Sequence, residues 1–426
     1  MATALVSSLR HAWRVEDLRN RILFTLGMIF VYRVGVHIPI PGLDPRVIES
    51  LMQQGSIFGL LDIFSGGALR YFSVFAMGII PYINASIIMQ LLQVVIPKIE
   101  QWAKEGEEGR KKITQWTRYG TVLLAFIQAA GLTFFIVRSR PDALLFHNVL
   151  GYLTVVIILT AGTTFLMWLG EQMTEKGIGN GISILIFAGI VSRLPSGFVT
   201  MIQYLKGGVV HYFNVIILAL VGLAIIVGVI VIQQGQRRIP VQYAKRMVGR
   251  RMYGGRSTHI PIRVNTAGVI PVIFASSLLA LPQTIAQFFS HPWIQAVNNF
   301  FRYGGFWHES IFFLLIVAFT FFYTAIVFNP ADVAENIRKY GGFIPGIRPG
   351  RPTKEYLERV LIRLTVVGGL FLATVSVLPP IVSAISGVPN IYFGGTALLI
   401  VVGVALETMM QIESQLVMRQ YQGFLR

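Results

Sequence analysis

Long apolar runs recur along the chain, separated by shorter polar stretches that carry most of the charged residues. Each run is close to the roughly 20 residues that an α-helix needs to cross a hydrocarbon core about 30 Å thick. The pattern predicts ten membrane-spanning helices, and Arg193 and Pro195 interrupt the fifth. It therefore indicates an all-α polytopic membrane protein. The predicted spans begin near Ile22, Tyr71, Tyr119, Val149, Ile182, Val209, Ala267, Ser310, Val360 and Ile391.

The overall composition supports the same class of protein. Apolar residues make up 54% of the 426 residues, charged residues make up 13%, and the mean hydropathy is +0.65. A water-soluble chain of this length covers its surface with more charge than that. The chain contains no cysteine, which excludes disulfide bonds and thiolate metal sites.

Lysine and arginine are concentrated in alternate loops, here named by the spans that they join. The N-terminal arm, the 2/3, 4/5, 6/7 and 8/9 loops and the C-terminal tail hold 28 of the 36 basic residues, whereas the opposite loops hold seven. Basic residues near span ends resist translocation, so both termini are predicted to be cytoplasmic. The remaining basic residue, Arg33, lies inside the first predicted span, where it either snorkels to the interface or pairs as a structural residue.

The 6/7 loop is more basic than orientation alone requires. Its segment 237–263 carries eight Lys or Arg and no acidic residue. Part of this charge is the ordinary signal of membrane topology. The rest, interspersed with tyrosine, methionine and proline, suits a polyanion such as ribosomal RNA, an acidic protein face or anionic lipid headgroups.

An internal repeat indicates passage across the bilayer. "GIIPYINASII" at 78–88 and "GVIPVIFASSL" at 268–278 share six of eleven positions, in spans that run in opposite directions. Two inverted five-span halves are typical of transport proteins with a pathway at the repeat interface. The predicted halves are 1–205, with a segment of interest at about 55–70, and 206–426, with the 6/7 loop at 233–266 and the 8/9 loop at 329–359.

The spans offer little for binding ions or polar solutes. All five aspartates lie outside the spans, and Glu171 and Glu407 lie near span ends. A secondary transporter of small solutes, the alternative function, normally places ionisable residues at mid-membrane. Signatures such as HExxH, GxSxG and the P-loop are absent, and "GIGNG" at 177–181 fits a tight turn better than a nucleotide loop. We therefore predict no enzymatic activity, no catalytic residue, no cofactor and no metal site.

Isoleucines lie in the middle of the repeat motifs. Ile79 and Ile83 share a helix face, and Ile273 is the repeat mate of Ile83. If these isoleucines gather at a narrow point, they exclude water and close a pore. The alternative is that they face lipid or a neighbouring helix, as most isoleucines in membrane spans do. Before the second span, the glycine-rich segment 55–72 is too short to cross the bilayer; it fits either a re-entrant segment that packs into a cavity or a surface helix.

Eight motifs resemble the bacterial SecY family, in order along the chain from about Arg21 to Gln411. They are "IPIPGLD" at 38–44, "FSGGAL" at 64–69, "PYINASIIMQLL" at 81–92, "EGEEGRKKITQWTRYGT" at 105–121, "MWLGEQMTEKGIGNGISILIF" at 167–187, "GQRRIPVQYAKR" at 235–246, "FNPADVAENIRKYGGFIPGIRPG" at 328–350 and "FGGTALLIVV" at 393–402.

This resemblance implies the pore-forming subunit of a protein translocase in the bacterial cell membrane. Unfolded polypeptides would pass through an hourglass-shaped channel that also opens sideways to lipid between spans 2 and 7. A constriction ring, a plug on the outer side and a lateral gate would control it. The resemblance implies the ring residues Ile79, Ile83, Ile186, Ile273 and Ile400; the plug residues Phe58, Leu60, Leu61, Ile63, Phe64, Gly66 and Gly67; and the gate residues Pro81, Asn84, Ser86, Pro271, Ala275 and Ser276.

The resemblance also implies partners. The 6/7 and 8/9 loops would dock the motor ATPase SecA or a translating ribosome, SecE would clasp the two halves, SecG would lie at the side, and signal sequences would enter the lateral gate. Asn84 departs from the serine that the family often has, and the tail after Gln411 is short. The implied docking residues are Arg237, Arg238, Lys245, Arg246, Arg250, Arg251 and Arg348.

Overall fold

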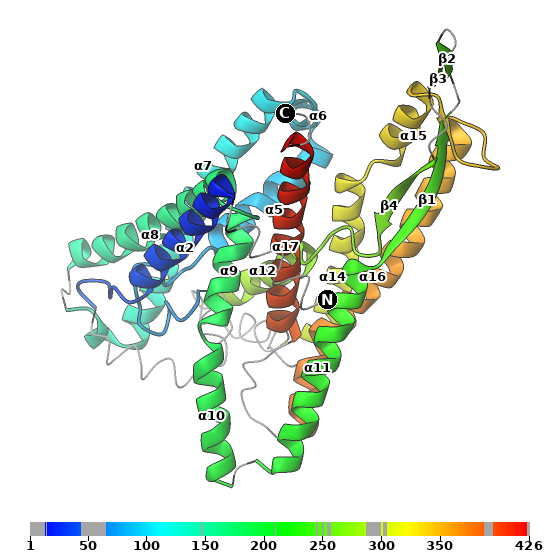
Figure 1. Ribbon diagram of the computed structural model, residues 1–426. Coiled ribbons are helices and arrows are strands. Elements are labelled where there is room, and N and C mark those ends of the chain that lie inside the picture. The colour runs from blue at the N-terminus through cyan, green and yellow to red at the C-terminus, as the bar shows by residue number, and fades with distance from the viewer. Residues whose placement is uncertain are drawn as a thin grey trace. The chain divides into compact units, whose positions relative to one another are not determined.

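The computed structural model of the chain consists of long helices and one small set of β-strands (Figure 1). The structure describes residues 13, 15–43, 65–145, 148–208, 210–243, 246–248, 251–253, 257–286, 300, 305–386 and 395–423.

The chain divides into two compact units. Unit 1 comprises Met1–Val209, Ser276–His308 and Val404–Arg426, and unit 2 comprises Val210–Ala275 and Glu309–Gly403. Two helices, α12 (Ile270–Ala286) and α17 (Gly395–Gly423), contribute residues to both units. The other helices of unit 1 are α2 (Glu16–Val36), α5 (Ile80–Val95), α6 (Pro97–Lys104), α7 (Glu107–Ser139), the 3-10 helix η1 (Pro141–Ala143), α8 (Val149–Lys176), α9 (Gly181–Val191) and α10 (Leu194–Lys206).

Unit 2 combines helices with strands. Its helices are α11 (Tyr212–Gln234), α14 (Phe306–Val327, whose first three residues belong to unit 1), α15 (Pro330–Lys339) and α16 (Arg351–Ser386). Its strands are β1 (Gln236–Tyr243), β2 (Arg246–Val248), β3 (Arg251–Tyr253), β4 (Ser257–Arg263) and β5 (Gly342–Phe343).

The predicted membrane class is confirmed. Within the described residues, seven helices are long and apolar enough to cross a membrane, or eight if α5 and α6, which meet at a bend of 101°, count as one span. The break between α9 and α10 falls at Ser192 and Arg193, yet Gly181–Lys206 still qualifies as one span. Two further helices lie at the first and seventh predicted spans but are not among the seven. They are α2, whose charged residues lower its hydropathy, and α12, which is apolar but shorter.

The second span begins later than the sequence pattern suggested. An irregular segment occupies 65–79, and the helix α5 starts only at Ile80. Gly66, Gly67 and Gly78 have positive φ angles, which an α-helix excludes, and Pro81 at the first turn favours a helix start there. Most of the segment is buried, so its described part is neither a surface helix nor a membrane span.

The irregular segment 65–79 is part of the core of unit 1. Its apolar residues pack with α7, α8 and the chain after α2. A backbone bridge pairs Pro39 with Ser73, and the amide of Ile40 donates to the carbonyl of Phe72 (3.1 Å). The buried members of this core include Ile40, Leu69, Phe72, Ala76, Ala129, Leu132, Val155, Val156 and Leu159.

Candidate functional site

All five predicted ring isoleucines are buried. Ile79 precedes the first turn of α5, and its carbonyl accepts the amide of Ile83 (3.1 Å), so the two side chains share one face of that helix. Ile186 lies on α9, Ile273 on α12 and Ile400 on α17. The exposed fractions are 3% for Ile79, 3% for Ile83, 1% for Ile186, 5% for Ile273 and 1% for Ile400. Because these residues belong to both units, their convergence stays a prediction.

Two pairs of predicted gate residues, Pro81 with Pro271 and Ser86 with Ser276, occupy equivalent positions in α5 and α12. Pro81 and Pro271 each follow the first residue of their helix. Ser86 is half-buried and accepts a hydrogen bond from the amide of Gln90 (3.2 Å). Ala275 is fully buried and Ser276 is half-buried.

Asn84 is the most unusual of the predicted gate residues. It is 2% exposed, and neither atom of its side-chain amide has a hydrogen-bond partner among the described residues. Leaving a buried polar group unpaired costs about 1–3 kcal/mol, so such groups are rare in native proteins and mark functional positions. Asparagine at this position is therefore a candidate for contact with something that enters the gate.

Only the end of the predicted plug lies within the described residues. Gly66 and Gly67 have φ angles of +65° and +92°, a backbone conformation that favours glycine. Phe58, Leu60, Leu61, Ile63 and Phe64 lie outside the described residues.

The basic 6/7 loop folds as a β-hairpin, which the sequence analysis did not anticipate (Figure 1). The strands β1 and β4 pair antiparallel from Gln236 opposite Arg263 to Gln242 opposite Ser257. The shorter pair β2 and β3 follows between them along the chain. The alternation of apolar and polar residues in "RIPVQY" and "THIPIR" is the sequence feature that could have predicted these strands.

The 6/7 and 8/9 loops form one sheet. The strand β5, from the 8/9 loop, pairs with β1 through Gln242 opposite Phe343 and Tyr243 opposite Gly342, which gives the order β4-β1-β5. Pro240 fits in β1 because only β4 pairs there, and it has no amide to donate to a second neighbour. We call this sheet, with α15 and the turn 344–350, the platform.

An apolar core lies beneath the platform. Ile239 and Val241 alternate with exposed residues along β1, and they pack on α15 and the first turns of α16. Leu357 of α16 is fully buried among them. Asn329 caps α15 by accepting the amide of Ala331 (3.0 Å). The platform is therefore a packed unit rather than a pair of loose loops.

Arg348 projects from a fixed turn of the platform. Ile344, 3% exposed, and the half-buried Ile347 anchor the turn in the apolar core, whereas Arg348 itself is exposed. The hydroxyl of the buried Thr353 donates to the carbonyl of Arg348 (2.9 Å) and fixes its backbone. The flanking Gly346 and Gly350 adopt φ angles of +80° and +101°.

Few acidic side chains neutralise the predicted docking residues. Arg237, Arg238 and Arg348 are exposed and form no ion pair with another described residue, whereas Lys339 and Arg351 pair with Glu335 and Glu355 (both 3.1 Å). An exposed cation without a counter-ion attracts polyanions over about 8–10 Å at physiological salt. Arg246 and Arg251 lie on β2 and β3, and Lys245 and Arg250 lie outside the described residues.

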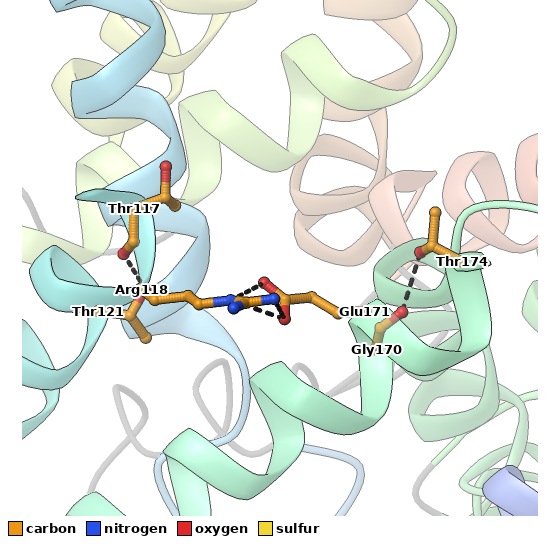
Figure 2. Close-up of polar contacts among 6 residues, drawn as sticks. All are labelled: Thr117, Arg118, Thr121, Gly170, Glu171 and Thr174. Carbon is orange, nitrogen blue, oxygen red and sulfur yellow. Dashed lines mark hydrogen bonds and ion pairs between the residues drawn. The ribbon is translucent and has the colours of Figure 1, made fainter. Parts of the chain in front are cut away.

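An ion pair that the sequence pattern does not reveal joins two spans (Figure 2). The guanidinium of Arg118 on α7 binds both carboxylate oxygens of Glu171 on α8, at 2.8–3.0 Å. Nearby threonines bond to carbonyls of their own helices, such as Thr121 to Thr117 and Thr174 to Gly170. Glu171 is thus committed to a structural pair, which disfavours a role as ligand of a coupling ion.

The "GIGNG" stretch forms the turn between α8 and α9. Gly179 has a φ angle of +80°, and the side chain of Asn180 caps α9 by accepting the amides of Ile182 (3.1 Å) and Ser183 (3.2 Å). Within the described part of the chain, three or more His, Cys, Asp and Glu side chains nowhere gather in a geometry suited to a metal ion.

Comparison with known proteins gives matches along most of the chain. The family model described as SecY matches residues 73–409. The chain is 52% identical to the protein translocase subunit SecY of Halalkalibacterium halodurans, over 98% of this chain and 99% of that protein. It is 49% identical to the protein translocase subunit SecY of Bacillus subtilis, over 97% of this chain and 98% of that protein.

Solved structures share the fold at low sequence identity. A structure of a protein conducting channel superposes with a TM-score of 0.64 at 18% identity, covering 93% of this chain and 92% of the other. Sec61 in a canine ribosome-channel complex from the endoplasmic reticulum gives a TM-score of 0.61 at 16% identity, with the same coverage. A SecY structure whose plug domain is described as stabilising the closed translocation channel gives 0.66 at 18% identity, again with the same coverage.

Proposed function

The chain belongs to the SecY family of protein translocase subunits, and from this premise we propose how its residues form and control a polypeptide channel. It is the pore-forming subunit of the general secretory translocase, which passes unfolded polypeptides across the membrane and releases hydrophobic segments sideways into lipid. The similarity to SecY subunits over nearly the whole chain carries this conclusion. The two halves of the channel are 1–205 and 206–426.

The constriction consists of Ile79, Ile83, Ile186, Ile273 and Ile400. Their burial and the matching places of Ile83 and Ile273 in the two repeat motifs support this assignment. Alkyl side chains offer no binding site to a polypeptide that varies in charge and size at every residue. Such a ring lets the translocating polypeptide slide through, and it excludes water when the pore is empty.

The plug and the gate control this constriction. The plug at about 55–70 rests against the ring on the outer side. The description of the related SecY structure, in which the plug domain stabilises the closed state and maintains a membrane seal, supports the sealing role. The gate between α5 and α12 opens for signal sequences. Asn84, buried without a partner among the described residues, lies where it would meet them.

The platform lies on the cytoplasmic side and docks the partner that drives translocation. The pairing of β1 with β5 supports this proposal because it holds the basic hairpin and the turn of Arg348 in one packed unit. Its exposed arginines suit ribosomal RNA and equally an acidic face of SecA. The related Sec61, which forms a ribosome-channel complex, supports the ribosome as one such partner. Anionic lipid headgroups would meet the same basic residues close to the membrane.

The remaining proposals concern the assembly as a whole. SecE and SecG accompany the chain in the bacterial plasma membrane, with both termini in the cytoplasm. The chain has no catalytic site of its own, so the motor ATPase or the ribosome supplies the energy.

Reconstitution tests this function directly. The purified chain, with SecE and SecG in liposomes, is incubated with SecA, ATP and a secretory precursor, and protease protection of the precursor is measured. We expect protection that depends on SecA and on the signal sequence. Uptake of a small solute by the chain without partners, together with unprotected precursor, would instead support a secondary transporter.

A further inference from the structure

Arg33 binds the segment that leads into the ring. Its Nη1 donates to the carbonyl oxygen of Gly66 (3.0 Å) and to the hydroxyl of Ser192 (2.9 Å), at the end of α9. The Ser192 hydroxyl in turn donates to the carbonyl of Gly189 (2.7 Å). Beside Arg33, the hydroxyl of Tyr32 donates to the carbonyl of Ser65 (3.0 Å). Two neighbouring residues of α2 therefore hold two successive carbonyls of the irregular segment 65–79.

The same segment is enclosed by glycines on three helices. A methyl group at Gly35 of α2 would collide with the ring of Phe75, and one at Gly162 of α8 would collide with the carbonyl of Val74. The Cα of Gly66 lies against Gly189 of α9, where an added methyl would be only 3.1 Å from it. Each neighbouring helix thus approaches the segment as closely as a backbone can, and its position is tightly specified.

The segment is also strained. Phe72 has a φ angle of +41°, the sole positive value among the described residues that are not glycine. Such a conformation costs on the order of 1–3 kcal/mol and persists only where surrounding contacts enforce it. Loss of those contacts would favour a different arrangement of the segment.

The hydrogen-bond acceptors of Arg33 are neutral. Among the described residues it forms no ion pair, so its half-buried charge depends on the Gly66 carbonyl and the Ser192 hydroxyl. Movement of the segment would deprive this cation of an acceptor, which makes the present arrangement the favoured one.

We propose that Arg33, with Tyr32 and Ser192, is a latch that holds segment 65–79 in the closed state of the channel. The segment ends at Ile79, a residue of the proposed ring and the cap of α5, so its release displaces the first ring residue. Arg33 is a positioning residue: it acts on the pore through the segment and touches no translocating chain. This inference rests on the proposed ring.

The latch is tested by single-channel current in planar bilayers and by export of a precursor with a damaged signal sequence. Arg33→Met removes both hydrogen bonds, and we expect the open fraction without partners to rise about tenfold, which corresponds to about 1.4 kcal/mol. Tyr32→Phe keeps the ring that stacks on Phe75 and removes only the hydroxyl, so we expect a rise of about threefold. Both variants should also export the damaged precursor, and Arg33→Lys should fall between Arg33→Met and the unmodified protein.

The matched control is Arg21→Met on the same helix. Arg21 also donates to a glycine carbonyl, that of Gly177 (3.4 Å), which lies outside segment 65–79. We expect background current from it. The variant Ile83→Gly with Ile186→Gly tests the ring separately. If this ring variant conducts while folded Arg33→Met and Tyr32→Phe stay at background, the latch is refuted and the channel proposal stands. If all of them stay at background, ring and latch are both refuted, whereas precursor protection by the unmodified protein still tests the translocase function.

Discussion

At the scale of single residues, Arg348 is the sharpest test of the platform. Arg348→Glu reverses an exposed charge on a turn whose backbone is fixed by Thr353 and by Ile344. We expect slower association and weaker binding of SecA or the ribosome, because like charges then meet, while the membrane-embedded part keeps its stability. Binding kinetics at two salt concentrations and a thermal melt measure both effects.

The control for Arg348 is Lys354→Glu, which makes the same change in net charge on the exposed first turn of α16. A general electrostatic effect would weaken binding equally in both variants. Normal partner-driven translocation by Arg348→Glu at normal expression would contradict the docking role.

Gly162 provides a second residue-scale prediction. Gly162→Ala places a methyl against the carbonyl of Val74, which is backbone and cannot swing aside. We expect a loss of about 1–3 kcal/mol of stability from this overpacking, measured by thermal unfolding in detergent. Gly27→Ala is the control, because nothing lies within 4 Å of the added methyl; comparable melting of the two variants would show that α8 does not contact segment 65–79 as described.

At the scale of elements, the platform should lose order when a side chain of its apolar core is truncated. Leu357→Ala removes a fully buried side chain beneath the sheet without changing any charge. Large-to-small changes of this kind cost about 2–5 kcal/mol. We expect faster hydrogen exchange in β1, β4 and β5 and weaker partner binding, although every docking arginine is still present.

Ile362→Ala on the same helix is the matched control, since 47% of its side chain is exposed. It should leave hydrogen exchange in the strands unchanged. Full partner binding by Leu357→Ala, with an exchange-labile sheet, would mean that the loops dock without being held together.

At the scale of the whole molecule, the lateral gate predicts a cross-link. Cysteines introduced near Ser86 on α5 and near Ala275 on α12, in a chain that has no cysteine of its own, should include a pair close enough to form a disulfide in the resting state. Such a bridge should block export until it is reduced, because it closes the route of the signal sequence to lipid. Gel mobility and precursor protection before and after reduction measure both effects, and failure of every scanned pair to bridge in any state would refute the gate.

The ring makes a prediction at the same scale. Replacement of several of Ile79, Ile83, Ile186, Ile273 and Ile400 by Gly or Ser, ideally with residues 60–67 also deleted, should wet the constriction and let small ions pass without partners. If these side chains instead face lipid or a neighbouring helix, the changes should cost roughly 1 kcal/mol or more per site in stability and leave conductance at background. Single-channel current and a thermal scan separate the two outcomes.

The sequence by itself determined the class, the family and the approximate positions of most membrane spans. Spans and their interruption at Arg193 could be predicted because hydropathy is a local property, summed over roughly 20 neighbouring residues. The positive φ angles of Gly66 and Gly67 are local in the same sense, since such an angle restricts the residue type at a single position.

Only the tertiary structure decided how distant segments hold one another. It joined Tyr243 to Gly342 in one sheet, which turned two basic loops into a packed platform. It also decided between the two roles that the sequence left open for Arg33, by placing the guanidinium on a carbonyl 33 residues away and on a hydroxyl 159 residues away. Every residue except proline offers the same backbone amide, and every residue offers the same carbonyl. A hydrogen bond to the backbone therefore does not restrict the type of residue that carries the amide or carbonyl, and the sequence alone cannot predict it.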